Sequence, residues 1–191
     1  MSFLTSTNTE LIYTSIAPGT QLDTFTTEDN LQKTLPPVIL PAGFFGNIKD
    51  QGKRIRVQAR GRMGTTGTPT FTFSLRLLTS TTWSAAGIGF STAAITTASG
   101  VTLVGWELEA EIVMRTLGIG AASTILVMGK IISGAGFASP FIYTIPTGNT
   151  TFTAATYDNS VTNYLFLSAA CSASSGSNLL KLESLAVYGE N

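Results

Sequence analysis

The chain has 191 residues, with 11 basic and 11 acidic side chains and no histidine, so its formal net charge at pH 7 is zero. Dedicated nucleic-acid-binding domains carry a basic excess, which this chain lacks. With no histidine and with Cys171 as the single cysteine, the sequence excludes a Ser-His-Asp triad, a Cys/His zinc site and an intrachain disulfide.

The low share of charged residues, the abundance of threonine and the hydropathy favour β structure and a surface that is partly buried against a partner. Charged residues make up 12% of the chain, about half the usual share, and threonine, which favours strands, is abundant. The mean hydropathy of +0.28 indicates apolar surface that a partner covers. The opening MSFLTSTNTE lacks the features of a secretory signal, and the apolar runs are too short to span a bilayer. We therefore expect synthesis in a cytoplasm and no membrane partner.

The first 45 residues differ from the rest of the chain. A strand is predicted over 10–17, followed by a polar stretch and then TLPPVILPAGFF, whose prolines Pro36, Pro37 and Pro41 oppose regular pairing. We expect residues 18–45 to be extended, and we treat 1–45 as an N-terminal arm that packs along its own domain or reaches a neighbour. Residues 46–191 are expected to form one domain.

Alternation with period two is clearest in 53–63 and 69–77. The two runs are separated by GTTGTP, and this pattern predicts an antiparallel hairpin. In the first run the apolar face is Ile55, Val57, Ala59 and Met63, and the polar face is Arg54, Arg56, Gln58, Arg60 and Arg62. In the second run Phe71, Phe73, Leu75 and Leu77 form the apolar face.

The rest of the chain predicts further strands separated by turn-forming residues. Residues 84–100 are expected to be a loop with one edge strand. Strands are predicted over 106–115, 124–133, 139–145, 150–157, 163–173 and 178–188. Eight to ten strands at spacings of about ten residues predict an all-β fold, an antiparallel, jelly-roll-like β-sandwich, with a closed barrel as the alternative.

Two charged rows are the main candidates for a functional surface. They are Arg54, Arg56, Arg60 and Arg62 on one strand and Glu107, Glu109 and Glu111 on another. If the two strands are neighbours, cross-strand charge pairs follow. A nucleic-acid surface would need aromatic side chains between the basic ones, but the neighbouring aromatics face the core. The glutamates lie in a line about 7 Å apart, which suits a charged sheet face better than a catalytic pair or a metal site.

Other candidate chemistry is sparse. Cys171 falls on an apolar strand face and is predicted to be a buried, unreactive thiol. The GTTGT run lacks the lysine of a phosphate-binding loop. An exposed tyrosine beside Asp and Asn could stack on a sugar ring, and Tyr157, Asp158 and Asn159 form the best such candidate. We expect no enzyme activity and no cofactor.

Three stretches resemble the small β-sandwich virion proteins of tailed bacteriophages: LPPVILPAGFFGNIKDQGKRIRVQARGRMGTTGTPTFTFSLRL, GWELEAEIVMRTLG and DNSVTNYLFLSAACSASSGSNLLKLESLAVYGEN. The resemblance covers residues 40–191 and rests on strand patterns. It implies a capsid decoration (cement) protein, often a homotrimer, that binds the major capsid protein on the outside of the virion. The alternative is a head-fibre or tail-associated module that recognises a host surface glycan.

The resemblance and the residue patterns together give a set of expected subunit or capsid contacts. They are Phe44, Phe45, Arg54, Arg56, Arg60, Arg62, Glu107, Glu109 and Glu111.

Overall fold

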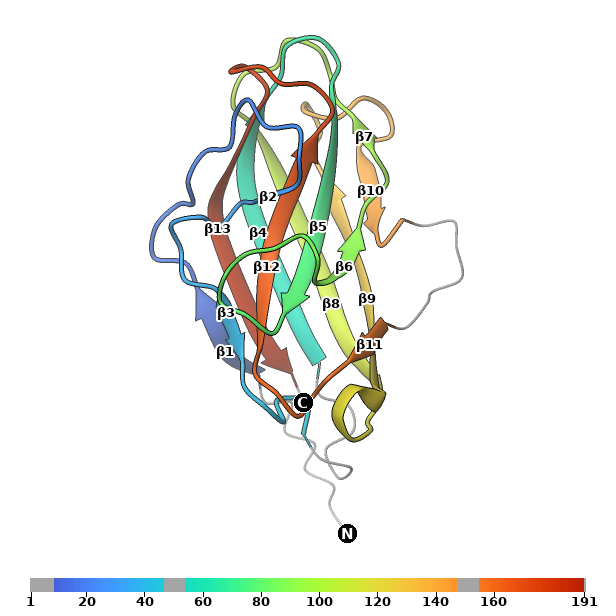
Figure 1. Cartoon of the computed structure of the whole chain (residues 1–191). Coiled ribbons are helices and arrows are strands. Elements are labelled where there is room, and N and C mark those ends of the chain that lie inside the picture. Colours follow the sequence, from blue (N-terminus) through green and yellow to red (C-terminus); the bar gives the residue numbers. More distant parts are fainter. Residues whose placement is uncertain (1–8, 47–53, 148–154, 191) are drawn as a thin grey trace.

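The structure is a computed structural model that describes residues 9–46, 54–147 and 155–190 (Figure 1). The elements in these ranges are strands and a single short 3-10 helix, η1. In chain order they are β1 (Thr9–Thr14), β2 (Asp29–Asn30), β3 (Val38–Leu40), β4 (Arg54–Gly64), β5 (Thr70–Leu78), β6 (Ile88–Ser91), β7 (Ile95–Thr96), β8 (Val104–Thr116), η1 (Gly120–Ala122), β9 (Ser123–Ile132), β10 (Ile142–Ile145), β11 (Ala155–Tyr157), β12 (Asn163–Cys171) and β13 (Leu179–Glu190).

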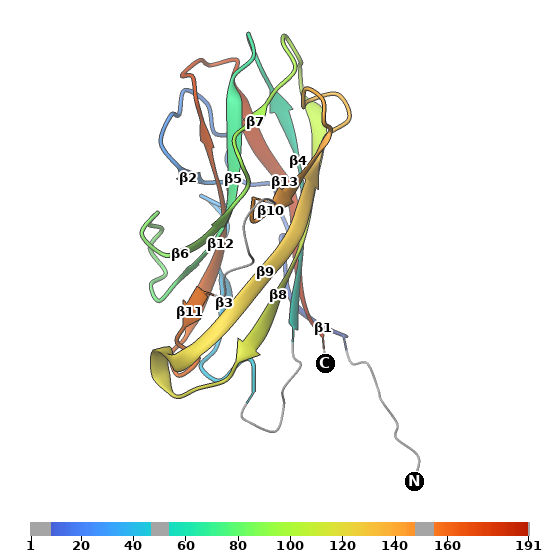
Figure 2. The same ribbon diagram turned by 90° about the vertical axis from the view of Figure 1, so that its right-hand side faces the viewer.

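The strands form two antiparallel sheets packed face to face (Figure 2). The seven-stranded sheet has the order β1-β13-β4-β8-β9-β10, with β11 also paired to β9. The six-stranded sheet has the order β2-β12-β5-β6, with β3 also paired to β12 and β7 to β5. The predicted all-β sandwich is thus confirmed, whereas a jelly-roll connectivity stays a prediction.

The core lies between the sheets and is built from the apolar face of each alternating strand. Ile55, Val57, Phe71 and Phe73 are fully buried, as the period-two pattern predicts. Trp106 of β8 contacts Phe73 of β5 across the core, with ring centroids 5.2 Å apart. Each fully buried side chain of this size stabilises the fold by about 1.5–3 kcal/mol relative to an exposed one.

The predicted hairpin between β4 and β5 is wrong, because the two strands belong to different sheets. β4 pairs with β13 and β8, whereas β5 pairs with β12, β6 and β7. The GTTGTP connection crosses from one sheet to the other, and hydrogen bonds from Thr65 N to Val101 O (2.9 Å) and from Thr66 N to Asn178 Oδ1 (2.8 Å) hold it. Alternation indicates which face of a strand is buried, and it does not specify the strand's hydrogen-bonded partner.

Residues 9–45 contribute strands to both sheets of the sandwich, and an arm distinct from the domain stays a prediction. β1 adds to the edge of the seven-stranded sheet beside β13, while β2 and β3 pair with β12 of the six-stranded sheet. Between these strands, Leu22 forms a backbone bridge with Leu180. β3 pairs regularly although prolines surround it, because Pro37 and Pro41 flank the strand and leave its own amides free to donate.

Candidate interaction surface

The outer face of the seven-stranded sheet brings the two predicted charged rows together. β4 pairs antiparallel with β8 so that Arg60 lies opposite Glu107 and Arg56 opposite Glu111. These residues alternate with buried ones, so their side chains point away from the core. The prediction of cross-strand pairing between the rows is confirmed. We call this surface, made by the outward side chains of β13, β4, β8 and β9, the charged face.

Ion pairs link the rows and extend them to neighbouring strands. Arg60 Nη2 lies 2.7 Å from Glu107 Oε1, and Arg54 Nη1 lies 3.8 Å from Glu111 Oε2. On the far side of β8, Lys130 Nζ of β9 lies 3.7 Å from Glu109 Oε2. The sign of charge therefore alternates from the arginines of β4 to the glutamates of β8 and to Lys130 of β9.

β13 contributes two acidic partners that the sequence analysis did not identify. Glu190 Oε2 lies 2.8 Å from Arg54 Nε, and its Oε1 lies 3.1 Å from Arg56 Nη2. Glu183 Oε1 lies 3.4 Å from Arg62 Nε. Glu183 lies within the predicted strand 178–188, whereas Glu190 lies beyond its predicted end. The register between β13 and β4 places Glu190 opposite Arg54, and Glu183 lies at the irregularity between Leu182 and Ser184.

These ion pairs contribute little to folding stability. The Arg60 side chain is 69% exposed and the Arg62 side chain 56% exposed, so water screens both charges. Exposed pairs of this kind stabilise a fold by about 0.2–1 kcal/mol each. The alternation itself fixes the register, because a slip of one residue would turn these charged side chains toward the core.

Apolar side chains lie among and beside these charges. Met128 is 42% exposed and lies opposite Glu111, while Ile142 of β10 is 58% exposed and lies opposite Ile132. At the other margin, Leu11 of β1 is 55% exposed. Four central strands of about eleven residues span roughly 36 Å by 19 Å, or about 700 Å² in projection. This is close to the roughly 800 Å² that one partner contributes to a standard protein–protein interface.

Phe44 and Phe45 do not belong to this surface. They are 8% and 2% exposed and lie in the core, where the Phe45 ring meets the Phe44 ring edge-on at 5.3 Å and the Tyr157 ring at 5.5 Å. The structure contradicts the expected contact role for these two phenylalanines. The GFF sequence closes one end of the sandwich, because the apolar rings are buried against the end of β11.

The proposed sugar platform on Tyr157 is also contradicted by burial. Tyr157 is 1% exposed, and this burial raises the pKa of its phenol above the usual range. Asn159 is 7% exposed and serves the backbone: its Oδ1 accepts from Phe45 N (3.4 Å) and its Nδ2 donates to Gly46 O (3.2 Å). Asp158 is the member of this trio that stays at the surface, where hydrogen bonds from Ser160 lower its pKa.

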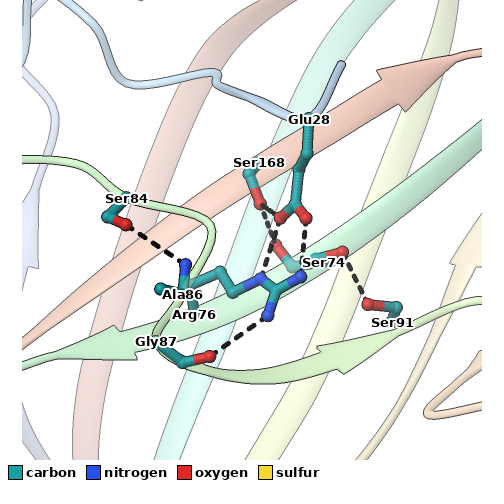
Figure 3. Close-up of polar contacts among 8 residues, drawn as sticks. All are labelled: Glu28, Ser74, Arg76, Ser84, Ala86, Gly87, Ser91 and Ser168. Atoms are coloured by element: carbon teal, nitrogen blue, oxygen red, sulfur yellow. Dashed lines mark hydrogen bonds and ion pairs between the residues drawn. The ribbon is translucent and has the colours of Figure 1, made fainter. Parts of the chain in front are cut away.

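A second polar cluster lies on the outer face of the six-stranded sheet (Figure 3). Glu28, just before β2, accepts two hydrogen bonds from Arg76 of β5, at 2.9 Å from Nε and 2.6 Å from Nη2. Ser168 Oγ of β12 donates to the same carboxylate at 2.5 Å, and Arg76 Nη1 donates to Gly87 O at 3.1 Å. The cluster fastens the N-terminal segment to the sheet and fixes the loop before β6.

The pKa of Glu28 reflects this environment. Burial alone would raise the pKa, but the hydrogen bonds and charge of Arg76, together with the Ser168 hydroxyl, bring it below its ordinary value. The sequence shows Glu28 and Arg76 48 residues apart with no local signal that joins them.

Among the described residues, few side chains could act as a nucleophile or as metal ligands. Cys171 is 2% exposed, its Sγ lies 3.2 Å from Ala173 O, and burial raises the pKa of its thiol. Among the residues that the structure describes, no group of three Asp, Glu, Cys or His side chains could hold a metal ion. The same ranges contain no helix with the length and apolar character needed to cross a membrane.

Comparison with known proteins gives no relative: no family model, curated protein or solved structure matches this chain.

Proposed function

We propose that this protein is a structural virion component that decorates and stabilises the outer surface of a phage capsid, as a homotrimer bound to the major capsid protein. The observation that supports it most is the charged face, a broad sheet surface that no segment within the described residues covers. The virion setting rests on the sequence resemblance described above. The face supplies the feature such a protein needs, which is an ordered surface large enough for a stable contact.

The arrangement of charge supports binding between copies. β4 presents a basic row and β8 an acidic row, so every copy offers both signs. The two rows lie side by side on one face, so in a closed ring this face of one copy would bind a different surface of the next copy and present both signs of charge to it. Such pairing favours the correct orientation and penalises like-charge contacts.

The exposed apolar residues would contribute hydrophobic free energy to such a contact. Met128 and Ile142 lie beside the charges, so a partner would remove them from water. A protein that binds an assembled lattice and not the separate subunit stabilises the lattice by mass action. Stabilisation of the shell therefore requires no catalytic chemistry.

The direct test compares particles with and without this protein under heat and low salt, with release of packaged DNA as the signal. We expect removal to lower the temperature of DNA release and re-addition to restore it. If the release temperature is unchanged while adsorption to cells falls, the proposal is wrong and the head-fibre or tail module takes its place.

A charge swap tests the face itself. Arg60→Glu combined with Glu107→Arg keeps the pair within the chain but inverts the pattern seen by a partner. We expect the thermal unfolding midpoint of the isolated protein to stay within about 2 °C, because an exposed pair contributes little, while trimer formation and shell binding weaken at least tenfold. The matched control swaps Asp29 and Lys33, a partly exposed pair at 2.6 Å at β2 and the turn that follows it. Equal binding by both swapped proteins would exclude the charged face as the contact surface.

A further inference from the structure

A groove of about 430 Å³ lies away from the charged face, between the margins of the two sheets. One wall is the end of β5 and the loop that leads to β6, including Ser80 and Ser84. The other wall is Ala121 of η1, Thr156 of β11 and Asp158. A volume of this size accommodates a small organic ligand.

The polar groups of the groove combine one acceptor with hydroxyl donors. Asp158 Oδ1 accepts from Ser160 N at 2.8 Å and Ser160 Oγ at 2.6 Å, and within the described ranges Oδ2 makes no hydrogen bond. Ser80 Oγ accepts from Thr82 N at 3.1 Å, and Ser84 Oγ accepts from Ala86 N at 3.2 Å. Neither serine donates its hydroxyl hydrogen to a described residue, so both hydrogens are available to a ligand.

Both walls are held in place before any ligand binds. Arg76, itself fixed by Glu28, donates to Gly87 O and so anchors the loop that carries Ser84 (Figure 3). On the opposite wall, Asn163 Nδ2 donates to Asp158 O at 2.9 Å and to Val161 O at 2.9 Å, which fixes the turn that carries Asp158. A preorganised site loses less conformational entropy when it binds.

We propose that this groove binds a neutral polyhydroxylated ligand, a saccharide unit. A sugar hydroxyl both donates and accepts, so it can use Asp158 Oδ2 and the serine hydroxyls together. The lining contains no Lys or Arg, and the ionised Asp158 repels anions, so a phosphate or an acidic sugar fits poorly. Ile88, which is partly exposed, supplies the apolar surface against which the C–H face of a sugar packs, while Leu77 and Leu78 are buried in the wall.

This site goes beyond the proposed function and is independent of it, because none of its lining residues belongs to the charged rows. It also differs from the site predicted from sequence. Asp158 is common to both, but the partners are loop serines and aliphatic side chains in place of the buried Tyr157 ring.

The test is saturation-transfer NMR of the full chain with glucose, galactose, mannose, rhamnose and N-acetylglucosamine as neutral probes. Glucuronate serves as the anionic probe and putrescine as the cationic one. We expect saturable binding of at least one neutral sugar, with a dissociation constant in the order of millimolar, as is usual for small ligands with few contacts. Absence of binding by every neutral probe, or stronger binding of putrescine than of any sugar, would overturn the proposal.

Two variants locate the binding site. Ala121→Trp fills the groove from an exposed position, and Asp158→Ala removes the acceptor; each should weaken binding at least tenfold. The matched control is Ala85→Trp, an exposed residue of the same loop that does not line the groove, which should bind as the unmodified protein does. Thermal unfolding curves identify a variant that is misfolded. If Asp158→Ala is unstable, the sugar affinity of Ala121→Trp alone tests whether the groove is the binding site. Unchanged binding by a folded Ala121→Trp protein refutes the groove as the site.

Discussion

Replacement of Glu28 by glutamine should destabilise the protein far more than the same change at Glu107. Both carboxylates bind an arginine across strands, but the Glu28 and Arg76 side chains are 17% and 18% exposed, whereas Glu107 and Arg60 are 35% and 69% exposed. The comparison therefore contrasts a buried and an exposed Arg–Glu pair, and Glu28 also accepts a hydrogen bond from Ser168.

The magnitudes follow from the contacts. Breaking a buried ion pair costs about 3–5 kcal/mol, and a charge-assisted hydrogen bond contributes about 1.5–3 kcal/mol. Glu28 retains some solvent contact, and glutamine keeps one acceptor oxygen, so we expect Glu28→Gln to lower the free energy of unfolding by about 2 kcal/mol. For a chain of this length that corresponds to a fall of roughly 4–8 °C in the unfolding midpoint. Glu107→Gln should cost about 0.5 kcal/mol, or roughly 1–2 °C.

The stability difference between the unmodified protein and the Glu28→Gln variant should also depend on pH. The folded pKa of Glu28 is lowered from 4.5, so the ionised carboxylate favours the folded state. Its contribution is fully present above the unfolded pKa and is lost as the pH falls through the lowered folded pKa. Urea unfolding at pH 7 should therefore show the full difference between the two proteins, and the difference should shrink as the pH falls below 4.5.

Two results would contradict this expectation. One is a loss of stability in Glu28→Gln no larger than that in Glu107→Gln. The other is a stability difference that grows as the pH falls below 4.5, because that would require a raised folded pKa. Either result would show that the cluster in Figure 3 does not fasten the N-terminal segment.

Three further predictions concern the core and the thiol. Gly61→Ala should destabilise the protein by about 3 kcal/mol or prevent folding, because the added Cβ would overlap the Lys181 carbonyl oxygen and the Trp106 ring. The control is Gly105→Ala, whose added Cβ would have its nearest neighbour 4.0 Å away. This variant should have nearly the same urea midpoint as the unmodified protein. Phe45→Ala should lower the free energy of unfolding by about 3–5 kcal/mol, because it leaves a cavity in the core. Truncation of Ile16 to alanine, at a position that is 97% exposed, should be nearly neutral. Equal unfolding temperatures of the two variants in calorimetry would contradict the burial of Phe45. Cys171 should resist a thiol reagent at pH 8 in the native protein and react at once in denaturant, since burial raises its pKa and blocks access; rapid native labelling would contradict this.

Local sequence accounts for the long strands and for the face that each one buries, but it missed β2 and β3 and one of the two short strands β6 and β7. The alternation of Ile55, Val57 and Ala59 with arginines is a local property, because successive side chains of a strand point to opposite faces. It correctly assigns the outward arginines and glutamates of β4 and β8 and the burial of Cys171. The composition likewise sets limits on catalysis and metal binding that no fold could remove.

The pairing of strands and the contacts between polar groups that are distant in sequence could be identified only from the tertiary structure. β4 and β5 are consecutive and both alternate, but they are in opposite sheets. Glu190 reaches Arg54, and Glu28 reaches Arg76, through pairings between distant segments. Phe45, expected at a contact surface, and Tyr157, the candidate sugar platform, both face inward. The physical reason is that alternation arises from the geometry of neighbouring residues, whereas strand partners and burial at the ends of the sandwich depend on how the whole chain closes around one core.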